Sequence, residues 1–312
     1  TVTYTGNGSS PRSITGVGFQ PDFNWTKSRS ASGSHVLANA VSGANKQLVS
    51  NNTNAEATNG TYGYLSAFDS DGWSMTTGSN DFSRMNTNST TYASWNWKAN
   101  GAGSANTDGS INSTVSVNTT AGFSVVKYTG TGSTATVGHG LGVTPKMIIF
   151  KNTSSAVDWR VYHEALGNTH RLCLNDTSAS NNDDSAFNDT SPTSTVFTVG
   201  GSSSTNAGTM IAYCFAEKTG FSKFGSYVSS GSSDGPFCYT GMKPKFLLIK
   251  NASDSAEWEI YDSERAGYND ANYHLNAEDN SAEATLSGRL DLLSNGFKIR
   301  VTNSGPINSG TA

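Results

Sequence analysis

The feature that most constrains the fold is a pair of landmarks that recurs in register along the chain. Residues 4–9 (YTGNGS) recur at 128–133 and, more loosely, at 227–232. Each copy is followed by a strand-like run that starts with proline and ends with lysine; the three runs are 21–27, 145–151 and 244–250. Both landmarks move by 124 residues between the first two copies and by 99 between the last two. Two landmarks that move together indicate three related tandem segments.

The later parts of the copies also correspond. Trp159 and Trp258 stand eight residues after the lysine in copies two and three, and His35 takes this position in copy one. Copies one and two end in an aromatic strand, at 92–97 and 211–216, whereas copy three stops at 308–312. We therefore expect the closing strand of copy three to be missing and the chain to be part of a longer array.

Composition and alternation favour β-structure. Ser, Thr, Asn and Gly make up 146 of the 312 residues, which weakens helices, while 10% aromatic residues argue against disorder. Apolar and charged residues alternate with period two at 258–261 (WEIY) and 297–301 (FKIRV). The runs 147–150 and 246–249 are apolar on both faces, which predicts covered central strands. The fold predicted is all-β, with three tandem β-sandwich or jelly-roll repeats.

The repeats divide the chain into three predicted domains. They are 1–100, 101–220 with an N-terminal linker, and 221–312 without its closing strand. The linker at 99–121 is long and rich in Gly, Ser, Asn and Thr, whereas only 217–225 joins the second and third domains. We expect the second and third domains to pack tightly and the first to be a more independent module.

Several classes of protein are disfavoured. A net charge of -4 means that the chain has no excess of basic residues with which to bind nucleic acid. No apolar run approaches the ~18 residues that a membrane-spanning segment needs. Three cysteines form neither a disulfide framework nor a zinc motif. No histidine pair has metal-ligand spacing, and no nucleophile motif follows a clear strand. We predict no enzyme activity, no catalytic residues, no cofactor and no resident metal.

The turn at 68–73 (FDSDGW) resembles the start of a calcium loop, because Asp69 and Asp71 stand at alternate positions. The glutamate that closes such a loop is absent. A β-turn is therefore the favoured interpretation, with calcium binding left as the alternative.

The candidate ligand residues are Trp159, Tyr162, Trp258 and Tyr261, because sugar-binding sites use an exposed aromatic face for stacking. Trp159 and Trp258 hold equivalent positions in alternating strands. Equivalent positions belong to a shared core more often than to a shared ligand site, so core packing is the favoured alternative.

Taken as a set, the repeated blocks resemble a known family. They are 128–152, 159–163 and 212–217, together with 68–73 and 235–241. They are similar to a domain-of-unknown-function family that recurs in tandem in virion-associated proteins of marine tailed bacteriophages. The resemblance implies a structural or tail-fibre-like virion protein with a lectin-like β-sandwich fold, and it brings no catalytic residues.

The function predicted is that of an extracellular phage virion protein, in a tail fibre, an appendage or a capsid decoration. It would act by scaffolding and by binding a host surface or glycan. The partners expected are other virion proteins, a host surface glycan and further copies of the chain, with a trimer by analogy with fibres. One alternative is a bacterial carbohydrate-binding adhesin or surface-fibre protein, and another is a tailspike glycan depolymerase.

Overall fold

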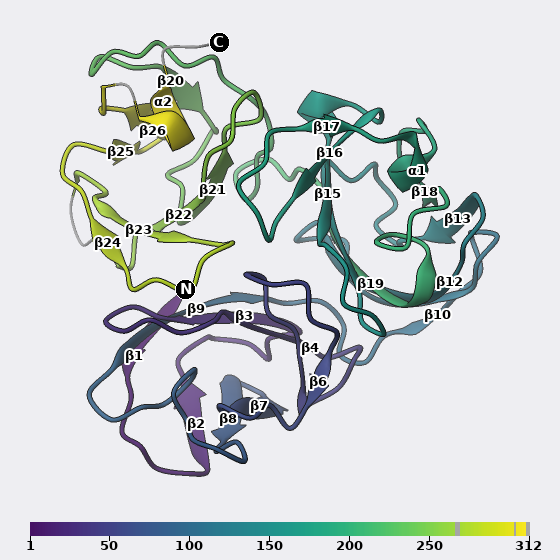
Figure 1. The fold of residues 1–312 in the computed structure, drawn as a ribbon, viewed down its shortest axis with the longest axis horizontal. Helices are drawn as coiled ribbons and strands as arrows, with labels where there is room; N and C mark the ends of the chain where they lie inside the picture. The colour runs from purple at the N-terminus through teal and green to yellow at the C-terminus, as the bar shows by residue number, and fades with distance from the viewer. Residues whose placement is uncertain (266–268, 303, 310–312) are drawn as a thin grey trace.

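Almost all of the regular structure in this computed structural model is β-strand. The structure describes residues 1–265, 269–302 and 304–309. Three groups of strands lie around a common centre (Figure 1). We call their parts of the chain the N-terminal segment (1–100), the middle segment (101–220) and the C-terminal segment (221–312). In each segment an inner sheet faces the centre and an outer sheet covers its other side. The all-β sandwich prediction is confirmed.

The N-terminal segment has a four-stranded inner sheet. Its order is β1 (Val2–Thr5), β9 (Thr91–Trp97), β3 (Phe23–Ser28), β4 (Val36–Asn39). The outer sheet is β2 (Arg12–Thr15), β8 (Gly72–Thr76), β7 (Tyr64–Asp69), and β5 (Lys46–Gln47) pairs with β6 (Ala57–Thr58). Every residue of β3 is buried, because Phe23 and Trp25 point to the centre while Asn24 and Thr26 bond to Ser94 on the other face.

The middle segment has an eight-stranded sheet. Its order is β10 (Ser104–Asn106), β11 (Ser113–Asn118), β12 (Phe123–Thr131), β19 (Ala207–Phe215), β14 (Met147–Asn152), β15 (Arg160–His163), β16 (His170–Cys173), β17 (Asn181–Asn182). The outer pair is β13 (Ala135–Gly138) with β18 (Val196–Val199), and the short helices are η1 (Glu164–Leu166) and α1 (Asp184–Phe187). Strand β14 is buried throughout, which confirms the covered strand predicted at 147–150.

The C-terminal segment is smaller. Its inner sheet is β21 (Phe246–Lys250), β22 (Trp258–Asp262), β23 (Tyr273–Asn276), β24 (Ala284–Thr285). Its outer sheet is β20 (Phe237–Tyr239), β26 (Gly296–Ile299), β25 (Leu290–Leu293), and α2 spans Gly305–Asn308. The covered central strand predicted at 246–249 is corrected. Over the described residues β21 is an edge strand, so Phe246, Leu247 and Leu248 are only half-buried.

All three segments share the core at the centre. Phe23 and Trp95 from the N-terminal segment, Tyr213 from the middle segment and Ile260 from the C-terminal segment belong to one buried cluster. The rings of Phe23 and Tyr213 stack with centroids 4.2 Å apart. Each segment also has a separate core between its two sheets. The expectation that the first domain is a more independent module is therefore wrong.

Candidate functional site

The two predicted ligand tryptophans lie where one segment packs on another. Trp159 is 0% exposed, and its Nε1 donates to the carbonyl oxygen of Val49 in the N-terminal segment at 3.1 Å. Trp258 is 3% exposed, and its Nε1 donates to the carbonyl oxygen of Cys173 in the middle segment at 2.7 Å. Neither indole presents a face to solvent, so the prediction that a sugar stacks on them is corrected in favour of core packing.

The two predicted ligand tyrosines lie in the outer cores. Tyr162 packs edge-on against Phe187 with ring centroids 5.6 Å apart. The buried Tyr261 hydroxyl donates to Glu259 and accepts a bond from Nε of Arg289 at 3.0 Å. The structure thus separates each tyrosine from its tryptophan by a sheet, and all four residues are interior.

His35 takes the place of the tryptophan in the N-terminal segment. Its Nδ1 accepts a bond from Nε1 of Trp25 at 2.7 Å, so the neutral ring carries its proton on Nε2. That Nε2 donates to the carbonyl oxygen of Asn276 in the C-terminal segment at 2.8 Å. Burial, helped by the charge of Lys27, lowers the pKa of His35 to about 3. The histidine therefore closes a circle in which each segment bonds to the next.

A lysine forms a second bond across each junction; Lys27 and Lys151 are buried and Lys250 is half-buried. Lys27, Lys151 and Lys250 are the lysines that end the three proline-led runs. Their Nζ atoms donate to carbonyl oxygens of the neighbouring segment, namely Ser281 at 2.8 Å, Thr53 at 2.8 Å and Thr177 at 3.0 Å, respectively. Burial lowers the pKa of Lys27 and of Lys151 to about 8.

A backbone bond forms the third link. The donors occupy equivalent places in the three segments, and so do the acceptors. The bonds run from the N–H of Glu56 to the oxygen of Thr153, from Ser180 to Ala252, and from Glu283 to Arg29, at 3.0, 2.8 and 2.7 Å. All three junctions therefore contain a side-chain bond from the aromatic position, a lysine bond and a strand-like backbone bond.

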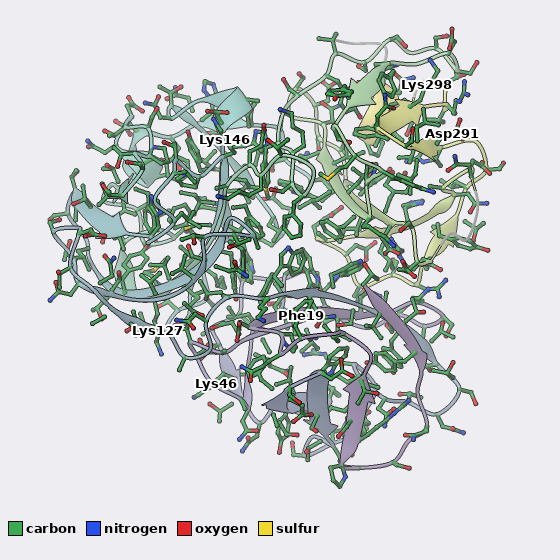
Figure 2. All side chains as sticks on the ribbon, turned by 180° about the vertical axis from the view of Figure 1, so that it is seen from behind. Phe19, Lys46, Lys127, Lys146, Asp291 and Lys298 are labelled. Atoms are coloured by element: carbon green, nitrogen blue, oxygen red, sulfur yellow. The ribbon has the colours of Figure 1, made fainter. Side chains whose placement is uncertain are left out.

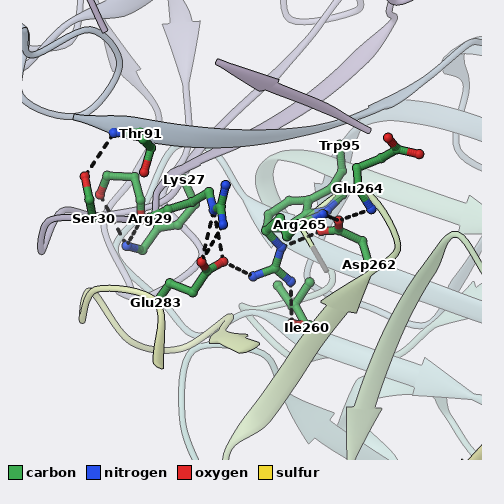
Figure 3. A network of polar contacts seen from close by, with 11 residues as sticks. Lys27, Arg29, Ser30, Thr91, Trp95, Ile260, Asp262, Glu264, Arg265 and Glu283 are labelled. Atoms are coloured by element: carbon green, nitrogen blue, oxygen red, sulfur yellow. Dashed lines mark hydrogen bonds and ion pairs between the residues drawn. The ribbon is translucent and has the colours of Figure 1, made fainter. Parts of the chain in front are cut away.

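The junction between the N-terminal and C-terminal segments, which we call the closing junction, carries further charges (Figure 3). Glu283 accepts two bonds from Nε of Arg29, both at 3.1 Å, and one from the terminal nitrogen at 2.7 Å. Arg265 bonds to Glu283 at 2.7 Å and to Asp262 at 2.6 Å, and Asp262 also accepts from Nε1 of Trp95 at 2.9 Å. The network therefore crosses the junction between two segments that are not consecutive in the chain and have no linker between them.

Loops from all three segments line an open polar depression of about 540 Å³. Its lining is Asn51, Asn175, Asp176, Thr177, Glu257, Glu278, Asp279 and Asn280. Three of these side chains accept backbone N–H bonds at equivalent positions, from His35 to Asn51, from Trp159 to Asn175 and from Trp258 to Glu278. Burial, with Glu257 and Asp279 nearby, raises the pKa of Glu278 to about 7.

The Asp69–Asp71 turn is a hairpin between β7 and β8. The Asp71 carboxylate accepts bonds from the N–H groups of Gly16 at 3.0 Å and Gly18 at 2.6 Å, and Asp69 accepts from Ser74 at 2.7 Å. These carboxylates are used within the protein, as the β-turn interpretation predicts. Across residues 1–265, 269–302 and 304–309, no group of three or more His, Cys, Asp or Glu residues is placed to hold a metal ion.

A family model described as Domain of unknown function (DUF7483) matches residues 1–312. The chain belongs to this family. One family match thus spans all three segments and their junctions. No match was found among curated proteins or among solved structures. Within the described part of the chain, no helix combines the length and the apolar character that crossing a membrane requires.

Sequence reasoning missed two groups of residues. The junction lysines each end a proline-led run in their segment, and that recurrence in the sequence was the available signal. The second group is Phe237 and Tyr239 on β20, which are 44% and 66% exposed. The equivalent strand of the N-terminal segment is β2, and the strand pairing shows that Ser13 and Thr15 take the same two positions there. Comparing the three segments position by position would have found these aromatic residues.

Proposed function

We propose that the protein is a non-catalytic structural module of an extracellular virion appendage, built from three copies of one β-sandwich unit. The observation that carries this proposal is the circle of equivalent junction bonds around one shared core. A circle closed by buried bonds resists rotation of one unit against another, which an element that transmits force or sets a spacing requires.

The place on a virion rests on the sequence resemblance to tandem domains of marine tailed phages. One observation from the structure and one from the composition support the proposal. Burial lowers the pKa of His35 to about 3 and that of Lys151 to about 8, and both side chains are occupied in holding segments together. The chain is rich in Ser, Thr and Asn with only 14% charged residues, which makes its contacts less sensitive to salt.

The test is to label intact particles of the phage that encodes the chain with an antibody raised against it. We expect electron microscopy to find the label at fixed positions on every particle. Label on uninfected host cells would support the adhesin alternative, and label absent from intact particles would contradict the proposal. A fall in the size of host polysaccharide on incubation with the pure protein would contradict the non-catalytic part and support the depolymerase.

A further inference from the structure

The outer sheet of the C-terminal segment exposes two aromatic side chains on one face of an edge strand. In β20, Cys238 pairs with Phe297 over the core, so Phe237 and Tyr239 point outward. Phe237 is 44% exposed and Tyr239 is 66% exposed. No other large exposed apolar side chain of the described residues belongs to β20, β25 or β26.

The neighbouring strand contributes a glycine to this face. Gly296 stands opposite Tyr239 on β26 and is buried, although it lies on the outward face. A Cβ at Gly296 would lie 3.0 Å from two ring carbons of Phe237, so this ring lies across the glycine. The half-buried Leu293 stands on the far side of Gly296 in the next strand, β25. We call this face, with its two exposed aromatic rings and the neighbouring Leu293, the shelf.

The rim of the shelf is polar and its charges are balanced. Lys298 pairs with Asp234 at 2.7 Å, and Arg300 pairs with Asp291 at 2.7 Å. Lys298 and Asp291 lie at the periphery of the C-terminal segment, away from the junctions (Figure 2). Two cations and two carboxylates offer hydrogen-bond donors and acceptors without a net charge, which suits a neutral ligand rich in hydroxyl groups.

We propose that Phe237 and Tyr239 form a binding shelf for the pyranose rings of a neutral glycan. The C–H face of a sugar stacks on an aromatic ring, and the paired charges of the rim bond to its hydroxyls. A protein partner fits less well, because a stable protein interface buries about 800 Å² on each side around an apolar centre, and two rings cannot supply that centre. The other segments carry Ser13 and Thr15, or Thr136 and Gly138, at these positions. The shelf is therefore specific to the C-terminal segment.

The inference goes beyond the structural role and does not depend on where the protein sits on a particle. Its test uses a printed array of neutral and acidic oligosaccharides, followed by titration of the bound sugars. The variant combines Phe237→Ser with Tyr239→Thr, which are the residues of the N-terminal segment. Phe221→Ser is the matched control, because Phe221 is 61% exposed outside this sheet.

We expect the unaltered protein to bind neutral sugars and the double variant to bind them at least about tenfold more weakly, or about 1.4 kcal/mol. The control should bind normally, and all three proteins should keep the same melting temperature within a few degrees. Three outcomes would overturn the inference: no sugar bound at about 1 mM, undiminished binding by the double variant, or a self-association that the double variant abolishes while no sugar binds. The last would make the shelf a docking edge for another copy of the chain.

Discussion

The junction between the N-terminal and middle segments and the closing junction use the same three bonds but are stabilised by different chemistry. The first is apolar, with Trp159 at its bonding position and Phe23 stacked on Tyr213. Among the described residues no ion pair crosses it. The closing junction has His35 in place of the tryptophan, and the Arg29–Glu283–Arg265 network lies beside it.

The difference follows from connectivity. The chain itself joins the N-terminal segment to the middle segment, so that contact forms between tethered partners and loses less entropy. The closing junction joins segments that are distant in sequence and have no linker between them, so non-covalent contacts alone must hold it. Charged hydrogen bonds are directional, so they fix the register of such a contact, although they make it sensitive to pH and to the loss of a single partner.

The largest effect is expected for Trp159→Ala at the apolar junction. The substitution leaves a cavity under the shared core and removes the donor for the Val49 carbonyl. We expect the free energy of unfolding to fall by about 3–5 kcal/mol, measured by denaturant titration. Trp159→Phe is the control that keeps most of the volume and should lose only about 1–2 kcal/mol. A loss below about 1 kcal/mol for the alanine variant would show that the junction does not depend on this residue.

Glu283→Gln tests the charged junction. It leaves Arg29 and Arg265 without their shared carboxylate, and Glu283 has a side chain that is only 8% exposed. We expect the free energy of unfolding to fall by about 3 kcal/mol in the same titration, because breaking a buried ion pair leaves the remaining charges buried without a partner. The matched control is Glu164→Gln, whose partner is Lys146 and whose side chain is 51% exposed, with an expected change below about 1 kcal/mol. Equal losses for the two variants would contradict the contrast between the junctions.

The local level of this fold was predictable from the sequence. Proline-led runs, period-two alternation and Gly- or Asn-rich turns placed strands such as β3, β14 and β22, because each depends on residues close together in the chain. The environment of β21 was not predictable in this way. Its sequence is as apolar as that of β14, and only the pairing partner on its second edge makes the difference.

The junctions were beyond sequence reasoning because they join residues such as His35 and Asn276, which lie far apart in the chain. Trp159 and Trp258 were correctly suspected of sharing one role, yet their bonds cross between segments, which a single alternating strand cannot reveal. The long linker at 99–121 suggested independence for the first domain. The length of a linker limits where two domains can touch, but it does not determine how favourable their contact is.

The smallest expected effect is a pH dependence confined to the closing junction. The pKa of His35 is about 3 in the folded protein, below its ordinary value of 6.5. Between these pH values the unfolded chain binds a proton that the folded chain does not, so acid favours unfolding. The stability that the neutral, buried His35 contributes is complete above pH 6.5 and is lost as the pH falls towards 3.

His35→Gln keeps a donor and an acceptor at this position without a titrating group. Between pH 7.5 and pH 4.5, we expect the unaltered protein to lose about 2–3 kcal/mol more stability than this variant, measured by denaturant titration at each pH. His170→Gln is the control, because His170 bonds to Thr169 within the middle segment. If His35→Gln and the unaltered protein lose stability in parallel, a protonated His35 is accommodated in the folded state. The closing junction would then owe its acid sensitivity to its carboxylates rather than to the histidine that replaces tryptophan.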